Sequence, residues 1–311
     1  MKRVALRLYV FALALLLTPV GALPQDAPQV GGNYHIYDAA GKTATLDQVI
    51  EAVTANEVVF IGETHNDQTA HLIERQLLEG AYAHLAQGSD KQNERRLVLS
   101  LEMFERDVQT ALDEYLAGLI TEPQFLASSR PWKNYQTDYR PLIEFARAHE
   151  LSVVAANAPE RYVNRVARLG RDSLKALSPD ALAWLAPLPY PAASPAYTAK
   201  FNEAMGGGEM HGTHGNPYLL DAQVLRDTTM AHSIAAQSKR QKHALILHVT
   251  GIFHTESRLG TPEQLHTYRP QTRVLVLTIV PAQANAATDI KQLAGLGDFV
   301  FVTGSGASAN F

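Results

Sequence analysis

The amino-acid sequence predicts an α/β fold: a mostly parallel sheet with helices on both faces, plus a Pro/Gly-rich insertion at about 187–217. Short apolar runs, each long enough for a strand and too short for a helix, alternate with longer segments whose apolar residues recur at helical spacing. The runs are almost continuously apolar, as strands are when helices cover both faces of a parallel sheet. This alternation indicates a single α/β domain over 46–311.

The expected strands are apolar runs bounded by Gly, Pro or charged residues. They are 58–61, 97–102, 151–156, 244–249, 274–280 and 298–302, with an edge strand at 34–37. The expected helices are 45–54, 67–87, 108–116, 142–149, 160–169 and 218–238. Asn66 and Asp67 offer N-cap oxygens to the second of these helices, and Pro159 suits the first turn of the helix at 160–169.

Residues 1–22 are predicted to be a cleaved secretory signal peptide. Basic residues precede an apolar run, and small residues follow at the −3 and −1 positions of a cleavage site: Lys2, Arg3, Arg7, 10–17, Val20 and Ala22. The run is short for a bilayer span, so an uncleaved membrane anchor is the less favoured alternative. Residues 23–45 form a loose lead-in to the domain. The sequence therefore predicts a periplasmic or secreted protein.

Charge and cysteine content exclude several classes of function. Cleavage after Ala22 removes three cations and no acids, so the formal charge moves from −4 to −7. An acidic protein of this kind does not neutralise phosphates, so nucleic acid is not an expected partner. The chain has no cysteine, which excludes disulfides, thiolate metal sites, a cysteine nucleophile and a lipid anchor on cysteine.

The composition changes between 187 and 217. Prolines, the glycine triplet 206–208 and two histidines predict an insertion with little regular structure, which is typical of a lid or a binding element. Met205 and Met210 add a flexible apolar surface to this segment.

Polar side chains stand where the predicted strands end. Glu63 and His65 follow the first strand, Glu102 ends the second, Asn157 the third, and His254 follows the fourth. In a parallel sheet these ends lie on one edge and converge on a crevice.

Two chemical interpretations of these strand-end residues stay open. Two imidazoles and two carboxylates, His65, His254, Glu63 and Glu102, suit a divalent metal that polarises a carbonyl or activates a water. Without a metal the same residues form a carboxylate–histidine acid/base pair. The alternative to both is that these side chains only cap helices and turns.

The remaining histidines carry less signal. His71 is six residues from His65, which is not a spacing that puts two ligands on one face of a helix. His84, His149 and His243 are expected on the surface.

Several motifs, in order along the chain, resemble the ChaN-like haem-binding proteins. They are FIGETH at 60–65, LSLEMF at 99–104, the segment 139–147 leading to VVAANAP at 153–159, RDTTMA at 226–231 and GIFH at 251–254. The resemblance extends from about residue 56 to 303. It places the chain in a wider superfamily with the Tiki-type metalloproteases and the erythromycin esterases.

The resemblance implies an exported protein that binds haem and takes part in haem or iron uptake. In such proteins a tyrosine phenolate, which favours ferric iron, holds the haem. Tyr197 is the first candidate ligand, then Tyr190 and Tyr218, while His211 and His214 are candidates to hydrogen-bond the phenolate or ligate the iron. Arg130, Lys133 and Lys200 are weaker candidates for contacts with the haem propionates.

The partners implied are haem, an outer-membrane haem receptor or other uptake components, and a second copy of the chain. The second copy is implied because a haem held on one face leaves its other face open for a haem-linked homodimer.

A hydrolase is the alternative function. In that interpretation Glu63, His65, Glu102 and His254 form the active site, with or without a divalent metal, and the insertion is a substrate lid. No Gly-x-Ser-x-Gly motif and no cysteine is present, so hydrolysis needs an activated water. A third interpretation is an α/β domain whose ligand is neither haem nor a hydrolysed substrate.

Overall fold

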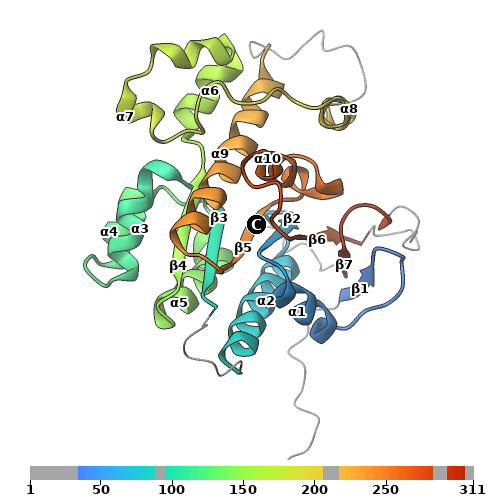
Figure 1. The fold of residues 1–311 in the computed structure, drawn as a ribbon. Helices are drawn as coiled ribbons and strands as arrows, with labels where there is room; N and C mark the ends of the chain where they lie inside the picture. The colour runs from blue at the N-terminus through green and yellow to red at the C-terminus, as the bar shows by residue number, and fades with distance from the viewer. Residues whose placement is uncertain (1–33, 88–94, 206–216, 283–292, 305–311) are drawn as a thin grey trace, which may run out of the picture. The chain divides into compact units, whose positions relative to one another are not determined.

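The computed structural model describes residues 34–87, 95–205, 217–282 and 293–304, which form a seven-stranded sheet with helices on both sides (Figure 1). Contacts divide the chain into two units, 1–31 and 32–311. The expected signal peptide belongs to the first unit and lies outside the described residues. Among the described helices, none is long and apolar enough to cross a membrane.

The sheet has the strand order β1-β7-β6-β2-β5-β3-β4. Its strands are β1 (Tyr34–Asp38), β2 (Val58–Glu63), β3 (Leu97–Glu105), β4 (Ser152–Asn157), β5 (Leu245–Gly251), β6 (Val274–Pro281) and β7 (Phe299–Thr303). All pairs are parallel except β1 with β7, which is antiparallel at the edge. The predicted fold class and every predicted strand are thereby confirmed.

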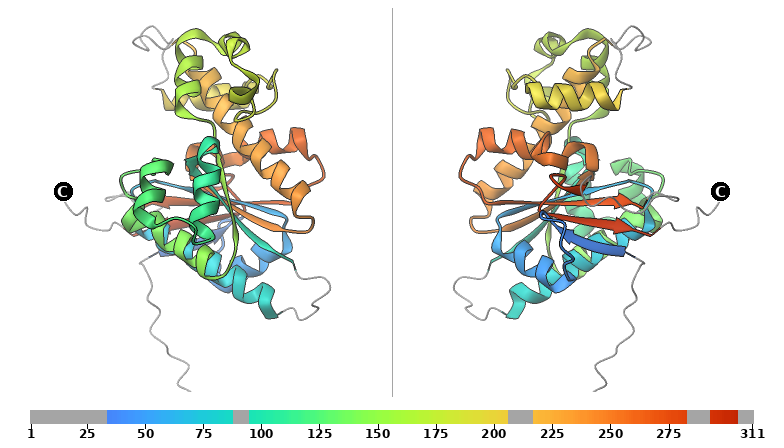
Figure 2. Two further views of the ribbon diagram at one scale, coloured as in Figure 1. Left: turned by 90° about the vertical axis from the view of Figure 1, so that its left-hand side faces the viewer. Right: turned by 90° about the vertical axis from the view of Figure 1, so that its right-hand side faces the viewer.

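The two faces of the sheet are filled by alternate residues of the same strands, because successive side chains of a strand point to opposite sides. On β2, Val59 and Ile61 pack in the core formed with α1 (Leu46–Ala55), α2 (Gln68–Gln87), α3 (Gln109–Leu116) and α5 (Arg140–Ala148). Val58 and Phe60 pack against α9 (Leu219–Arg240) and α10 (Thr261–Tyr268). Figure 2 shows α2 and α9 on opposite sides of the sheet.

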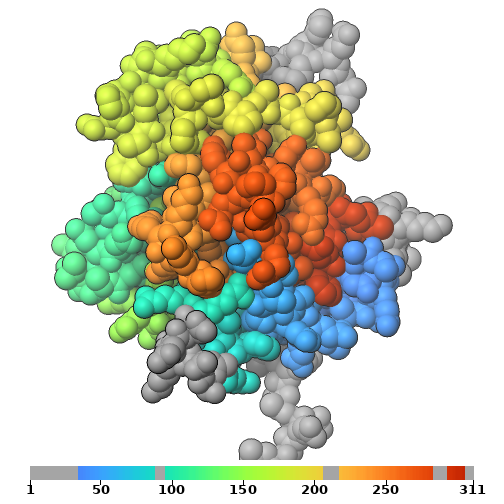
Figure 3. Space-filling view, in the orientation of Figure 1, coloured from blue at the N-terminus to red at the C-terminus, as the bar shows by residue number. Residues whose placement is uncertain are grey.

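A third core belongs to a group of helices that we call the cap: α6 (Glu160–Leu169), α7 (Pro179–Leu182), α8 (Pro195–Ala204) and the first half of α9. Its buried residues include Val166, Leu174, Tyr197 and Leu225. In the space-filling view the yellow-green side chains of the cap gather above the orange side chains of α9 and α10 (Figure 3).

The expectation of little regular structure in 187–217 was wrong for 195–204, which forms α8. Ser194 caps this helix by accepting a hydrogen bond from the Tyr197 backbone N–H at 3.1 Å, and Pro195 occupies the first turn, where its missing N–H costs nothing. Met210, His211 and His214 lie outside the described residues. The short helices α4 (Glu122–Ser129) and α10, which also have proline in their first turns, were not predicted.

Replacing Leu77 by Ala tests the assignment of the larger core. Leu77 is fully buried on α2, so Leu77→Ala is expected to lower the free energy of unfolding by about 2–5 kcal/mol through lost burial and a residual cavity. Leu119 is 75% exposed, and Leu119→Ala should change the free energy of unfolding by no more than about 0.5 kcal/mol. Urea unfolding measures both, and equal losses would contradict the assignment.

Candidate functional site

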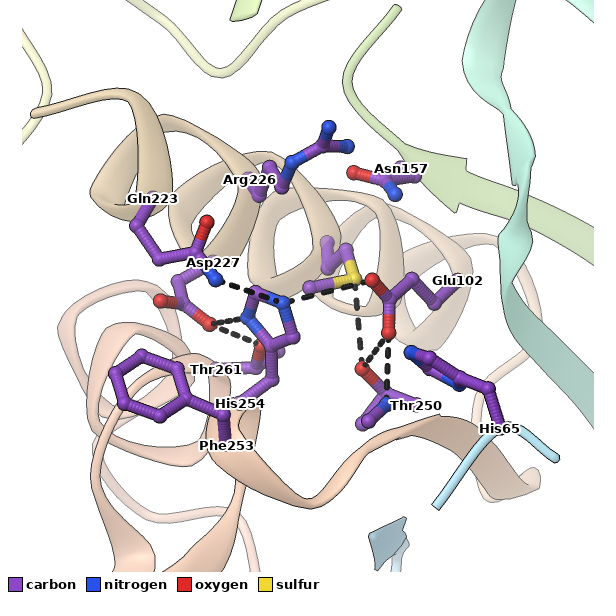
Figure 4. Close-up of polar contacts among 12 residues, drawn as sticks. His65, Glu102, Asn157, Gln223, Arg226, Asp227, Thr250, Phe253, His254 and Thr261 are labelled. Carbon is purple, nitrogen blue, oxygen red and sulfur yellow. Dashed lines mark hydrogen bonds and ion pairs between the residues drawn. The ribbon is translucent and has the colours of Figure 1, made fainter. Parts of the chain in front are cut away.

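Three adjacent strands, β2, β5 and β3, bring the predicted site residues to one edge of the sheet. β5 pairs with β2 on one side and with β3 on the other, all in parallel, so their carboxyl ends lie together. Here His65, Glu102 and His254 meet Thr250 of β5 and Asp227 of α9 (Figure 4). We call these five residues the strand-end cluster.

The carboxylate of Glu102 is buried and accepts hydrogen bonds there. Its Oε2 accepts hydrogen bonds from the Thr250 hydroxyl at 2.6 Å and from the Gly251 backbone N–H at 2.7 Å. Its Oε1 lies 3.5 Å from Nε2 of His254. Burial alone would raise the pKa of Glu102, but the neighbouring charges of His254 and His65 and the two hydrogen bonds lower it to about 2. Glu102 is therefore an anion over the whole physiological range.

His254 is oriented by a second buried carboxylate. Its Nδ1 lies 2.7 Å from Oδ1 of Asp227, and its Nε2 lies 3.3 Å from the Gln223 side-chain nitrogen. Burial lowers the pKa of His254, but the charges of Asp227 and Glu102 outweigh it and raise the pKa. The imidazole is thus held between two anions, an arrangement that suits a group that takes up and releases a proton.

Asp227 was not among the predicted site residues. It is buried on α9, and its two oxygens also accept hydrogen bonds from Thr261 of α10, at 2.8 Å, and from the Tyr197 hydroxyl of α8. The signal was present in the sequence, since an Asp on the apolar side of a long helix needs buried partners. Its partners come from α8, α10 and the turn after β5, which no local pattern connects to α9.

His65 is the exposed member of the cluster. Its side chain is 45% exposed, its Nδ1 lies 3.0 Å from Oε1 of Glu63, and its ring packs edge-on against Trp132. A Cβ on Gly251 would lie 3.0 Å from the His65 ring, so the ring reaches this position because residue 251 has no side chain. Burial lowers the pKa of His65, but the hydrogen bond to Glu63 and the charge of Glu102 raise it on balance.

The second carboxylate oxygen of Glu63 faces α2 and not Glu102. Its Oε1 also accepts a hydrogen bond from the Tyr139 hydroxyl, and its Oε2 lies 3.3 Å from Nδ1 of His71. The six-residue spacing from His65 gave no indication of this position of His71, whose ring meets both Glu63 and the backbone oxygen of His65. Burial lowers the pKa of His71, but the bond to Glu74 and the charges of Glu74 and Glu63 raise it to about 10.

The other predicted residues take simpler positions. Asn157 is buried at the end of β4, and its side-chain oxygen accepts a hydrogen bond from the next backbone N–H, of Ala158, at 2.8 Å. Arg130 pairs with Glu105 and Asp107, and Lys200 donates to the backbone oxygen of Phe253 at 2.6 Å. Four residues are exposed: Lys133, His84, His149 and His243, as expected for the three histidines.

The three candidate tyrosines differ in exposure. Tyr197 is buried and its hydroxyl donates to Asp227, while Tyr190 is buried and donates to the backbone oxygen of Asp221 at 3.2 Å. Burial raises the pKa of both phenols, and the charge of Asp227 raises that of Tyr197 further. Tyr218, the residue before α9, is 44% exposed.

Asp227→Asn tests the role of this carboxylate. The pKa of His254 is expected to fall, because the burial that lowers it remains while its nearest anion is removed. The free energy of unfolding should fall by about 1–3 kcal/mol, since three donors lose a charged acceptor. An NMR titration of the His254 ring measures the first effect and urea unfolding the second.

The matched control is Asp221→Asn, on the same helix but paired with Arg171. It should leave the His254 titration unchanged. An unchanged titration in Asp227→Asn itself would contradict the proposed pairing.

Comparisons with solved structures concern the fold. The structure of cofacial haem binding to ChaN of Campylobacter jejuni has a TM-score of 0.62 at 14% identity, covering 87% of this chain and 97% of that chain. A Bacillus cereus protein gives 0.49 at 10% identity, covering 84% and 92%. An erythromycin esterase mutant in its open conformation gives 0.47 at 11%, covering 87% and 83%. At such identities the first likeness shows a shared fold.

The curated proteins give no match to this sequence. A family model described as "Haem-binding uptake, Tiki superfamily, ChaN" matches residues 49–265, well over half of the chain. The resemblance found in the motifs is thereby confirmed, and the chain belongs to the ChaN family of haem-binding uptake proteins in the Tiki superfamily.

Proposed function

We propose that this protein is an exported carrier that binds ferric haem through a tyrosine and serves haem or iron uptake. Membership of the haem-binding uptake family supports the haem. The observation that supports ligation by a tyrosine is the exposure of Tyr218 on the cap. A phenolate is a hard anionic ligand that favours ferric iron, which suits a carrier rather than a redox enzyme.

Accessibility favours Tyr218 as the ligand over the two tyrosines that the sequence ranked above it. A ligand oxygen must reach the iron and lose its proton. Tyr197 would have to leave the core and release Asp227 to do so, and its raised pKa opposes ionisation. Among the described residues, none hydrogen-bonds the Tyr218 hydroxyl, and 206–216, with His211 and His214, directly precedes its loop.

The surface around Tyr218 fits a flat apolar ligand. A Cβ on Gly170 would lie 3.4 Å from the Tyr218 ring, so the ring packs directly on the backbone there. Leu169, which precedes Gly170 in the chain, is 53% exposed.

Two cations of the cap, Arg171 and Lys175, are candidates to contact the haem propionates, and each already pairs with a carboxylate, of Asp221 and of Asp172. A cavity of about 350 Å³ is lined by Arg171, Lys175, Leu188 and Tyr190, among others. Arg171 directly follows Gly170, so this positive group lies next in the chain to the tyrosine surface. Of the three cations suggested by the sequence, Arg130 pairs with Glu105 and Asp107, Lys200 donates to the Phe253 backbone, and Lys133 is exposed.

Two further parts of the proposal concern partners and location. A haem ligated on one face by Tyr218 presents its other face outward, so two loaded copies would pair as a haem-linked homodimer. The predicted signal peptide supports export to the periplasm or the medium, where an outer-membrane haem receptor or other uptake components would exchange haem with the protein.

A hydrolase is the second candidate function, favoured by the strand-end cluster. Asp227, His254, Glu102 and His65 provide an oriented base, an anion and an exposed imidazole, which is more than a carrier requires. In such an enzyme His65 or His254 would take the proton of an attacking water. A divalent metal held by His65, His254, Glu63 or Glu102 would supply Lewis acidity.

Haemin titration of the purified mature protein tests the carrier. Wild type should give a saturable Soret shift with a high-spin ferric charge-transfer band. Tyr218→Phe should remove that band and weaken haem binding by at least about 10-fold, because the anionic ligand is lost. Tyr197→Phe and Tyr190→Phe are the matched controls and should keep the band.

A band lost only in Tyr197→Phe would contradict the choice of Tyr218. A low-spin spectrum would instead assign the iron to histidine, with His211→Ala and His214→Ala identifying which. No saturable change in wild type would remove haem from the proposal.

A separate measurement tests the enzyme. If the strand-end cluster hydrolyses esters, His65→Ala should reduce turnover of a chromogenic ester by at least about 100-fold, because the exposed imidazole of the cluster is lost. The same variant should keep the wild-type haem spectrum, since His65 is not part of the cap surface. Loss of haem binding in His65→Ala would show that the two regions are one site.

A further inference from the structure

Glu63 belongs to a second cluster that the predicted metal set does not contain. His71 and Glu74, three residues apart on α2, face Glu63 at the end of β2. All three residues are buried, and one potential ligand atom from each lies within 4.8 Å of the other two. The histidine and glutamate are successive members of one helix face, because residues three apart are neighbours on a helix.

The ligand atoms are spaced as they would be around a small cation. Nδ1 of His71 lies 3.1 Å from Oε2 of Glu74 and 3.3 Å from Oε2 of Glu63. Around a tetrahedral Zn²⁺, with bonds of about 2.0–2.2 Å, neighbouring ligand atoms are about 3.3 Å apart. The observed separations therefore need little adjustment to accommodate an ion.

The other nitrogen of His71 fixes which one faces the carboxylates. Nε2 lies 3.1 Å from the backbone oxygen of His65 and 3.5 Å from Oδ2 of Asp138. Both partners are acceptors, so Nε2 carries the hydrogen. An ion bound at Nδ1 would displace the proton there, and Nδ1 would then present its lone pair on the side of the two glutamates. Metal-ligating histidines almost always donate their second N–H to a carbonyl or carboxylate in this way.

The buried carboxyl groups of this cluster outnumber the positive charge that faces them. No described residue donates a hydrogen bond to Oε2 of Glu63 or to Oε1 of Glu74, although both atoms are buried. Among the described ion pairs, neither carboxylate is matched by a lysine or an arginine. Asp138 adds a further carboxylate beside the ring. Even with His71 protonated, as its raised pKa favours, one positive charge faces three buried carboxyl groups, and a divalent ion would offset that imbalance.

We propose that Glu63, His71 and Glu74 bind a divalent transition-metal ion such as Zn²⁺ or Mn²⁺. One imidazole and two carboxylates are donors that these ions accept, and two carboxylates balance the charge of the ion. The site shares Glu63 alone with the predicted set of His65, His254, Glu63 and Glu102. It does not depend on haem binding.

Burial of all three ligands gives the ion a structural and positioning role. The ion would tie α2 to the end of β2 and fix one oxygen of Glu63, leaving Oε1 to hold His65 at 3.0 Å. His65 would therefore be oriented through the carboxylate of a metal ligand, as outer partners orient ligands in other metal sites.

Metal titration of chelator-treated full-length protein tests the site. Co²⁺, followed by its visible absorption, and Zn²⁺, followed by calorimetry, are expected to bind with a stoichiometry of one. Glu74→Gln and His71→Asn should each weaken binding at least about 10-fold, since each removes a ligand. Glu79→Gln is the matched control on the same helix, where Glu79 only pairs with Arg75 at 2.7 Å, and should bind as wild type.

The competing occupant is a proton shared between the carboxyl groups. In that case wild type would bind neither ion, and Glu74→Gln, which mimics a protonated glutamate, would be as stable as wild type. Either result overturns the proposal, as does Co²⁺ binding that survives both ligand variants. Binding that is lost in His254→Asn but kept in His71→Asn would also overturn it, by moving the ion to the strand-end cluster. Should Glu74→Gln not fold, His71→Asn decides the outcome alone.

Discussion

The carboxylate of Glu102 is buried at the centre of the structure and is tolerated there because β5 donates to it. Thr250 and Gly251 supply two hydrogen bonds to one of its oxygens. This is possible only when β3 and β5 are adjacent and in the observed register, with Leu101 opposite Val249. Because β5 also pairs with β2, satisfying one buried charge brings the ends of three strands, and the turn that carries His65, to the same place.

The sheet was predictable because its strands are local features of the sequence. Runs such as 58–61 and 244–249 are continuously apolar and end at polar or glycine residues, so periodicity and length identify them. The same strand-end argument correctly placed Glu102 and His254 near each other. It did not find Asp227 or His71, since both lie on helices and meet the site through contacts between elements far apart in the chain. Proline content concealed α8 for a different reason, because proline is compatible with a first helical turn.

The exposure of the tyrosines shows the same limit. Tyr190, Tyr197 and Tyr218 stand in similar proline-containing sequence, yet two are buried and one is not. Whether a phenol reaches solvent depends on the cap core, which α6, α7, α8 and α9 assemble from segments separated by dozens of residues. The cap surface around Tyr218 and the strand-end cluster at the sheet edge are thus products of different cores. One chain of this fold has room for a carrier site and for a catalytic site.

The three hydrogen bonds to Asp227 connect the cap with the strand-end cluster. Its carboxylate accepts from Tyr197 of the cap while it orients His254 beside β5. A ligand that shifted α8 would change the acceptor shared with His254 and so the proton affinity of that imidazole. By linkage, protonation of His254 would change the affinity of the cap for that ligand by the same factor by which the ligand changes the proton affinity of His254. Ligand binding at the cap and protonation of His254 would then each depend on the other.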